Sequence, residues 1–141
     1  MGTACKAAIA VAILAVVSGC STVNPAQTLS PIGALSAQPT GSEWMPRRIG
    51  NTSPVHSIVL TNPKTNNGPV IIESIKTDSD QFVIDDTKTT CARGTMPIGN
   101  SCVIGIKFIP NAAGTQTATL TIVDNAVNSP QTVSLSGVGL K

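Results

Sequence analysis

Four cysteines offer the most varied chemistry in this chain of 141 residues: Cys5, Cys20, Cys91 and Cys102. A cysteine sulfur can carry a thioether-linked lipid, form a disulfide or, as a thiolate, bind a metal ion. The segment around each cysteine determines which of these reactions is open to it. Cys5 and Cys20 flank an apolar N-terminal run, whereas Cys91 and Cys102 lie close together much further along the chain.

The first 20 residues have the composition of an export signal. Lys6 precedes an uninterrupted run of small and apolar residues over 7–17, and Ser18 and Gly19 follow it. A basic residue, a short apolar stretch and a small-residue cleavage site are typical of a secretory signal peptide, and the stretch is too short to span a bilayer. We therefore expect residues 1–19, and Cys5 with them, to be removed.

The segment Val17-Ser18-Gly19-Cys20 resembles the lipobox of bacterial lipoprotein precursors, which has an aliphatic residue, two small residues and an invariant cysteine. The resemblance implies a diacylglyceryl group on the sulfur of Cys20, cleavage just before it and acylation of the new amino terminus. An ordinary signal peptide that contains a cysteine is the alternative. The resemblance favours a lipid-anchored protein of the bacterial cell envelope. In lipoproteins of organisms with two membranes, Asp directly after the lipidated cysteine is the usual signal for retention at the inner membrane. Ser21 stands at that position, and the resemblance therefore implies the outer membrane as the destination.

Length and composition limit the rest of the chain to one domain. Residues 20–30 are polar, contain a proline and show no periodicity, so we predict the lipidated cysteine and a tether there and one domain over 31–141. The 9 Lys and Arg residues nearly balance the 7 Asp and Glu residues, and no basic block indicates a nucleic-acid partner. The few aromatic residues, Trp44, Phe82 and Phe108, argue against a stacking platform for bases or sugars.

Cys91 and Cys102 remain in the exported domain. An even pair of cysteines in an exported chain is more often a disulfide than a metal site. With one distant histidine, His56, the two cysteines do not have the spacing of a zinc site. We predict a Cys91–Cys102 disulfide that closes the connection between the fourth and fifth strands. A periplasmic metal-handling carrier that uses Cys91, Cys102 and His56 is the alternative.

Other polar residues give weaker signals for catalysis or metal binding. A Ser-His-Asp or Cys-His arrangement would have to be built on His56, the only histidine, and nothing near it in the sequence supplies the geometry of a nucleophile. Calcium prefers several oxygen ligands, but the four nearby aspartates follow no EF-hand spacing and a short strand interrupts them. These are Asp78, Asp80, Asp85 and Asp86. We interpret them as solvated loop charges, and we predict no catalytic residue, cofactor or metal site.

Alternation of apolar and polar residues predicts strands over 102–108, 117–123 and 132–135. Shorter β-prone runs cover 55–61, 70–75 and 81–85, and a first strand over 33–38 and 44–49 is broken at Pro39-Thr40-Gly41. No window after residue 20 has apolar residues at helical spacing. About seven short strands separated by turns indicate an all-β, immunoglobulin-like antiparallel β-sandwich. We expect these side chains to form its core: Ile58, Leu60, Ile104, Ile106, Phe108, Leu120 and Ile122.

Five motifs in order resemble a family of immunoglobulin-like domains. They are SIVLTN (57–62), GPVII (68–72), SCVIGIKFIP (101–110) preceded by Cys91, GTQTATLTI (114–122) and NSPQTVSLSGVG (128–139). They are similar to the strands of abnormal-spindle/Hydin-type (ASH) domains, whose bacterial versions are called choice-of-anchor D domains and which are related to the major sperm protein fold. The resemblance implies a sandwich and, in many relatives, protein–protein contact or an architectural role. It implies no activity, because such folds host many functions.

The sequence thus predicts a lipid-anchored envelope protein whose domain is a non-catalytic binding or scaffolding module. Its expected partners are the membrane, through Cys20, and an envelope or surface protein. Besides the metal-handling carrier, a further alternative is an accessory subunit of a surface or secretion assembly. Such a subunit would use an exposed edge strand to pair with a strand of its partner.

Overall fold

The computed structural model describes residues 32–141. The predicted signal peptide, the lipid attachment site at Cys20 and the predicted tether over 20–30 lie outside the described residues. Every regular element from residue 32 onward is a β-strand, which confirms the predicted all-β class. Over this part of the chain, no helix has the length and apolar character needed to cross a membrane.

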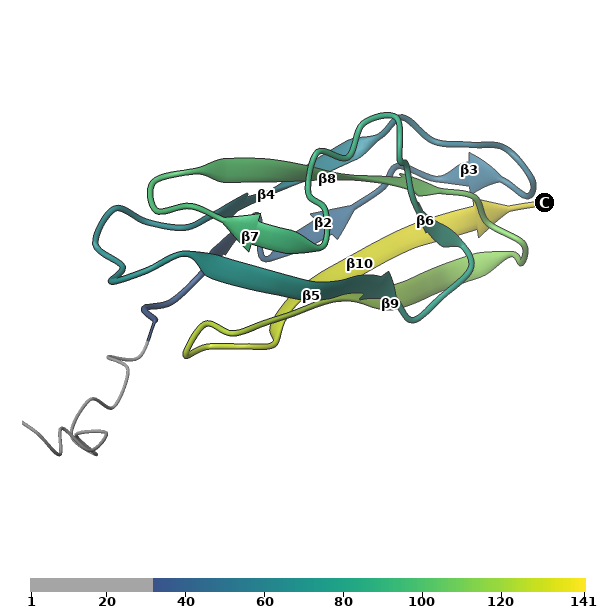
Figure 1. The fold of residues 1–141 in the computed structure, drawn as a ribbon. Coiled ribbons are helices and arrows are strands. Elements are labelled where there is room, and N and C mark those ends of the chain that lie inside the picture. Colours follow the sequence, from purple (N-terminus) through teal and green to yellow (C-terminus); the bar gives the residue numbers. More distant parts are fainter. Residues whose placement is uncertain (1–31) are drawn as a thin grey trace, which may run out of the picture. The chain divides into compact units, whose positions relative to one another are not determined.

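Ten strands form two sheets in the described residues (Figure 1). The first sheet contains, in spatial order, β1 (Ser36–Gln38), β4 (His56–Thr61), β8 (Ser101–Phe108) and β6 (Phe82–Ile84). The second contains β2 (Gly41–Glu43), β10 (Gln131–Leu140), β9 (Gly114–Asp124), β5 (Val70–Thr77) and β7 (Gly94–Met96), while β3 (Arg47–Arg48) also pairs with β10. Neighbouring strands are antiparallel, except that β2 and β3 run parallel to β10.

The core lies between the two sheets and follows the predicted alternation. All seven side chains expected to point inward are buried, each with 0% exposure: Ile58, Leu60, Ile104, Ile106, Phe108, Leu120 and Ile122. Trp44, Phe82, Val133 and Leu135 complete the largest buried set together with Val70. A sandwich of two sheets with alternating inward residues is the predicted immunoglobulin-like architecture, and the structure confirms it.

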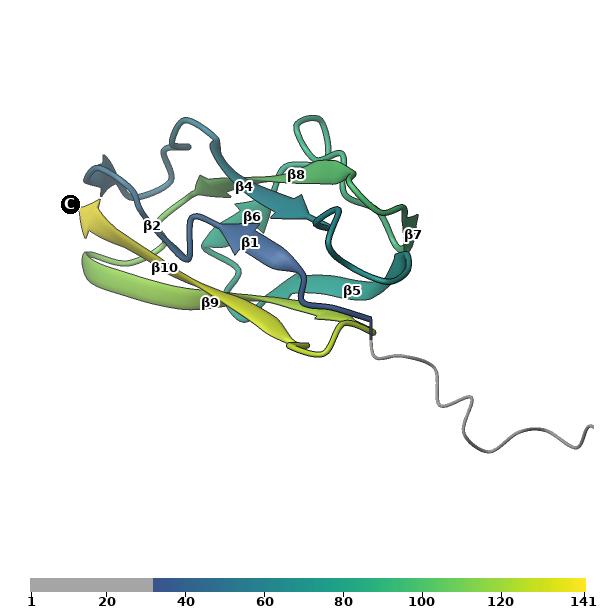
Figure 2. The same cartoon turned by 90° about the vertical axis from the view of Figure 1, so that its left-hand side faces the viewer.

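The broken first strand belongs to both sheets. β1 pairs with β4, and the chain then passes Pro39 and Thr40 and continues as β2 and β3 along β10 in the other sheet (Figure 2). Proline has no N–H to donate to a ladder, so the chain leaves the first sheet where its pairing would otherwise continue. The predicted break is confirmed at Pro39 and Thr40, where it marks a change of sheet. Gly41 already belongs to β2, however, and of the predicted second half, 44–49, only Arg47 and Arg48 are in a strand.

Two details of the strands differ from the sequence prediction. The short strand β7 was not predicted, and with the divided first strand it brings the number of strands to ten where about seven were expected. In β5, the register with β9 shifts between Ile72 and Ser74, which leaves Glu73 as a bulge. Because the bulge changes the parity of the strand, Ile75 packs against the core on the same face as Val70 and Ile72.

Two glycines of β10 allow neighbouring segments to approach its backbone closely. A Cβ atom on Gly137 would lie 2.6 Å from the Phe108 ring, and one on Gly139 would overlap the carbonyl oxygen of Ala112. The absence of a side chain therefore lets β10 pack directly against the end of β8 and the turn that follows it.

Candidate binding surface

His56 opens β4 and lies half-buried beside two residues from the first-strand region. Its imidazole stacks on Trp44, with ring centroids 4.4 Å apart and an angle of 15° between the planes. Its Nδ1 lies 2.7 Å from the hydroxyl oxygen of Ser42 in β2. This hydroxyl was not predicted from the sequence. Ser42 is 14 positions away, and only the passage of the first strand into the second sheet brings it there.

The Ser42–His56 pair has the contacts of a packing element. Trp44 is 2% exposed, donates from Nε1 to the carbonyl oxygen of Pro54 over 3.3 Å, and contacts Phe82 edge-on. Among the hydrogen bonds of residues 32–141, none joins a carboxylate to the imidazole. A serine nucleophile needs a histidine base that a third group orients, so this pair lacks the orienting member of a triad.

Two of the four aspartates considered for calcium, Asp78 and Asp85, make hydrogen bonds in separate parts of the domain. The Asp78 carboxylate accepts a hydrogen bond from the Thr119 N–H over 2.7 Å, in the second sheet. Asp85 accepts from the main-chain N–H and the hydroxyl of Thr87 over 3.0 and 2.6 Å, and it lies 3.6 Å from the Lys107 ammonium. The hydroxyl of Thr87, its N–H and the Lys107 charge lower the pKa of Asp85 against a partial desolvation. In the described part of the chain, no three His, Cys, Asp or Glu side chains are grouped as metal ligands.

Cys91 and Cys102 form the predicted disulfide, with their Cα atoms 4.9 Å apart. Both sulfurs are therefore bonded to each other and present no thiolate to a metal ion. His56 also lies far from them: Cys102 pairs with Leu60 and His56 with Ile106, four residues further along the same two strands, or roughly 13 Å. This arrangement does not provide the ligand set that the metal-handling alternative requires.

The disulfide holds one end of the segment that passes between the sheets. We call residues 91–93 the crossing segment: they leave the edge of the first sheet at Cys91 and enter the second sheet where β7 begins at Gly94. The main-chain N–H groups of Thr90 and Cys91 donate to the carbonyl oxygen of Val103 over 2.8 and 3.1 Å. The Val103 N–H donates to the Thr90 hydroxyl over 2.8 Å. Thr90 and Cys91, where the crossing segment begins, are thus attached to β8 by three hydrogen bonds as well as by the disulfide.

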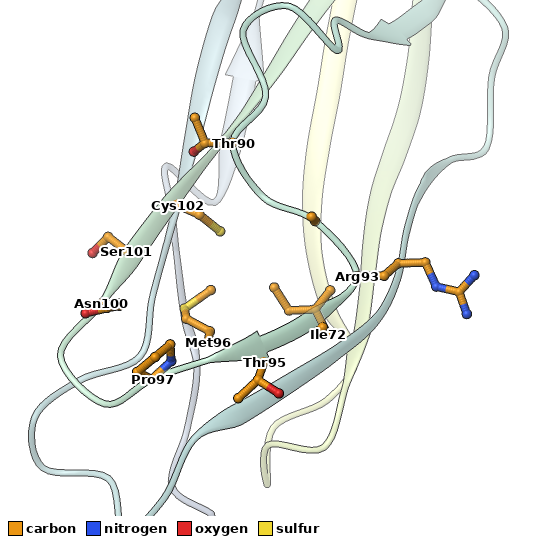
Figure 3. Close-up of a pocket in the computed structure, with 11 residues that line it drawn as sticks. Ile72, Thr90, Arg93, Thr95, Met96, Pro97, Asn100, Ser101 and Cys102 are labelled. Atoms are coloured by element: carbon orange, nitrogen blue, oxygen red, sulfur yellow. The ribbon is translucent and has the colours of Figure 1, made fainter.

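A cleft of about 220 Å³ lies between β7 and the first residues of β8. Ile72 and Met96 line it from the second sheet, and Ser101 and Cys102 line it from the first. Figure 3 shows the side chains of Met96 and Cys102 directed toward the same space, whereas the Arg93 side chain points away from it. Hydroxyl groups and sulfur atoms line this cleft without a titratable pair, so it offers contact surface and no acid–base chemistry.

A second cleft, of about 370 Å³, lies on the other side of the crossing segment. The half-buried side chains of Ile75 and Ile84 line it together with the largely buried Cys91. Charged residues of both signs also line it: Glu73 and Lys76 from β5, and Asp86 and Arg93 from the connection that leads to β7. Nothing in the local sequence predicted this cleft, because its walls come from two sheets and depend on the bulge at Glu73.

Comparisons with known proteins support the ASH resemblance. The family described as "Abnormal spindle-like microcephaly-assoc'd, ASPM-SPD-2-Hydin" (ASH) has a model that matches residues 45–132. The ASH/PapD-like domain of human CEP192 has a TM-score of 0.59 at 14% identity, over 85% of this chain and 94% of that one. The chain matches no curated protein sequence.

Other solved structures contain a similar domain within longer chains. A protein of unknown function from Porphyromonas gingivalis W83 has a TM-score of 0.63 at 17% identity, over 82% of this chain and 51% of that one. The VesB protease of Vibrio cholerae has a TM-score of 0.56 at 12% identity, over 76% of this chain and 32% of that one. The chain therefore spans about half of the Porphyromonas protein and about a third of the protease, and these identities show the fold alone.

Proposed function

The chain belongs to the ASH family, and we propose that it is a lipid-anchored protein of a bacterial cell envelope whose immunoglobulin-like domain is a non-catalytic binding module. The observation that carries this proposal is the combination, in one chain, of a lipobox-like segment ending at Cys20 with an ASH sandwich. A lipid fixes such a domain at a membrane, and a sandwich presents edges and loops to a partner.

The contacts of the chemically versatile residues support a role without catalysis. The His56 ring is stacked on Trp44 and its Nδ1 is occupied by Ser42, while Cys91 and Cys102 are joined to each other. These groups therefore already serve the packing of the domain. The similarity to a protease covers a third of that protein's chain and brings no activity to this one.

The proposed membrane partner is reached through Cys20. One acyl chain gives only marginal membrane binding, so stable anchoring requires the diacylglyceryl group together with the acylated amino terminus. In an organism with two membranes, we place the protein at the outer membrane on the basis of Ser21. The second proposed partner is an envelope or surface protein bound by the domain.

Fatty-acid labelling of the full chain tests the anchor. Wild-type protein expressed with a radiolabelled or clickable fatty acid is expected to carry the label and to partition into detergent. Cys20→Ser should abolish both the labelling and the cleavage, because the hydroxyl cannot form the thioether. Cys5→Ser is the matched control and should keep both. Equal labelling of wild type and Cys20→Ser would refute lipid attachment at this residue.

Cross-linking in the native host tests the binding role. We expect one or more envelope proteins to be cross-linked to the wild-type chain and also to the His56→Gln variant. Glutamine is a polar side chain of similar size to histidine, but it cannot act as a base. A turnover assay that found a substrate and lost activity in both Ser42→Ala and His56→Gln would instead show that the domain is an enzyme.

A further inference from the structure

β5 is paired over most of its length on one side and over its first three residues on the other. β9 pairs with residues Ile72–Thr77 of β5, apart from the bulge at Glu73. On the other side, β7 pairs with Val70, Ile71 and Ile72 and reaches no further. Within residues 32–141, the second half of β5 has no strand beside it on that side.

Hydrogen bonds to β9 show which main-chain groups of β5 are left at the free edge. The Asp78 N–H donates to the carbonyl oxygen of Thr119 in β9 over 3.2 Å. Successive residues of an antiparallel strand direct their N–H and C=O groups to opposite sides, so Lys76 also faces β9. Ile75 and Thr77 then direct their main-chain N–H and C=O groups away from β9, toward the free edge.

The free edge faces the second cleft. Ile75 and Ile84 line this cleft from opposite sheets, and it has a volume of about 370 Å³. The Asp85 N–H donates to Gly105 in β8, so the preceding residue, Ile84, directs its main-chain groups toward the cleft. At one end, the Thr77 hydroxyl donates to the carbonyl oxygen of Phe82 over 2.8 Å and joins the two sheet edges.

The position of Cys91 is consistent with this short pairing. β7 would cover more of β5 if it began earlier in the chain, opposite Glu73 and beyond. It begins at Gly94, and Cys91, three residues before, is held at the first sheet by the disulfide to Cys102 and by its hydrogen bond to Val103. The crossing segment passes from one sheet to the other between these two points.

We propose that an extended segment of a protein partner binds in this cleft and pairs with Ile75–Thr77 as an additional strand of the second sheet. This inference rests on the proposed binding function and names its site. Main-chain hydrogen bonds give such a segment affinity, and pockets for alternate side chains give it specificity. The cleft calls for an aliphatic side chain between Ile75 and Ile84, since both are apolar and half-buried.

The charges around the cleft restrict the flanking residues of the segment. Lys107–Asp85 is the one ion pair of the described residues, so Glu73, Lys76, Asp86 and Arg93 have no ionic partner there. Two carboxylates and two cations complement a segment with charges of both signs around its aliphatic residue. The bulge and the charged Lys76 are features by which edges avoid pairing with a second sheet. They therefore favour a single strand over a second copy of this domain.

Selection of peptides on the mature, full-length protein tests this inference. A phage-displayed library of random dodecapeptides is presented to the lipidated protein in detergent, and a selected peptide is titrated into isotope-labelled protein. We expect the amide NMR signals of Ile75, Thr77 and Ile84 to shift and their hydrogen exchange to slow. Ile75→Pro removes the N–H directed at the cleft and should weaken binding about tenfold or more, as the loss of main-chain hydrogen bonds to a ligand does. Thr132→Ala, at an exposed position of β10 outside the cleft, is the control and should keep the affinity within roughly twofold.

A change in the peptide keeps the test decisive if Ile75→Pro does not fold. Methylation of the central main-chain nitrogen of the selected peptide should weaken its binding to wild-type protein by a similar factor. The inference is overturned if no peptide is selected, if the shifts fall on another surface, or if the methylated peptide binds equally well. It is also overturned if sedimentation shows a dimer that Ile75→Pro dissociates, since the edge would then serve a second copy. Peptide binding at another surface would leave the proposed binding function standing, and fatty-acid labelling tests the anchor independently.

Discussion

Removal of the disulfide is the perturbation whose cost the structure defines best. The double substitution Cys91→Ala and Cys102→Ala opens a loop with a sequence separation of 11 residues. Closing a loop of this length lowers the entropy of the unfolded chain by an amount worth about 2.8 kcal/mol on the chain-entropy model. Alanine leaves no hydroxyl at position 91, where the wild-type side chain is largely buried, so no cost of polar burial is added.

The other contacts of the crossing segment limit the loss. The hydrogen bonds between Thr90, Cys91 and Val103 involve main-chain groups and the Thr90 hydroxyl, none of which the substitution removes. The core side chains other than those of Cys91 and Cys102 are also unchanged. We therefore expect the free energy of unfolding to fall by about 3 kcal/mol out of a total of about 5–15 kcal/mol, with the β-sheet circular dichroism retained.

Urea titration of the variant and of oxidised wild type measures this difference. A loss of about 3 kcal/mol corresponds to a decrease of roughly 10–20 °C in melting temperature for a domain of this size. Thr95→Ala, at an exposed position of β7, is the control and should cost less than about 1 kcal/mol. An unchanged stability in the double variant, or free thiols in wild type folded under oxidising conditions, would refute the structural role of the disulfide.

Three further changes test the packing and the buried charge. In urea titrations, Leu120→Ala should cost about 2–5 kcal/mol because the side chain is 0% exposed, whereas Thr119→Ala, on the opposite face of β9, should cost less than about 1 kcal/mol. Gly137→Ala should lower the melting temperature because its Cβ would lie 2.6 Å from the Phe108 ring; an unchanged value would show that the ring can move away. Burial raises the pKa of Asp124 above its ordinary value of 3.8, so the folded state binds the carboxyl proton more tightly than the unfolded chain does. The free energy of unfolding therefore falls as pH rises through the raised pKa and the carboxylate ionises. Asp124→Asn should therefore raise the free energy of unfolding at about pH 7 but have less effect below about pH 4, and the opposite pH trend would contradict this reasoning.

The sandwich and most of its core follow from local sequence patterns. In β8 and over residues 118–122 of β9, every second side chain is apolar, and a strand with one buried face requires nothing more to define that face. The assignment of Leu120 and Ile122 to the core depended only on this alternation, and both are fully buried. The disulfide could equally be predicted from the sequence, because an even pair of cysteines in an exported chain indicates a disulfide without knowledge of the fold.

The walls of the proposed binding cleft depend on features that alternation does not encode. A regular strand from Val70 would direct Ile75 to the outer face, and the bulge at Glu73 reverses this. The strand β7 has three residues and no alternation, so the local sequence does not predict its pairing with β5. The contact between Ser42 and His56 likewise requires the first strand to change sheets. Each of these features is a tertiary relation between segments that are distant in the sequence.

The two lateral edges of the sandwich differ in how their main-chain groups are satisfied, and this difference supports a binding role for one of them. Beside β1, the Leu35 N–H donates to the Asn128 side chain over 2.9 Å, and the Asn128 amide donates back to the Leu35 carbonyl oxygen over 2.8 Å. One side chain from the β9–β10 turn thus satisfies both main-chain groups at the approach to β1. At the opposite edge, Thr77 makes a side-chain contact with Phe82, but β7 ends its pairing at Ile72. Exposed sheet edges are usually covered because they invite unwanted pairing. A domain that ties the approach to β1 to Asn128 and leaves Ile75 and Thr77 without a neighbouring strand has the asymmetry expected of a module that pairs with one strand of a partner.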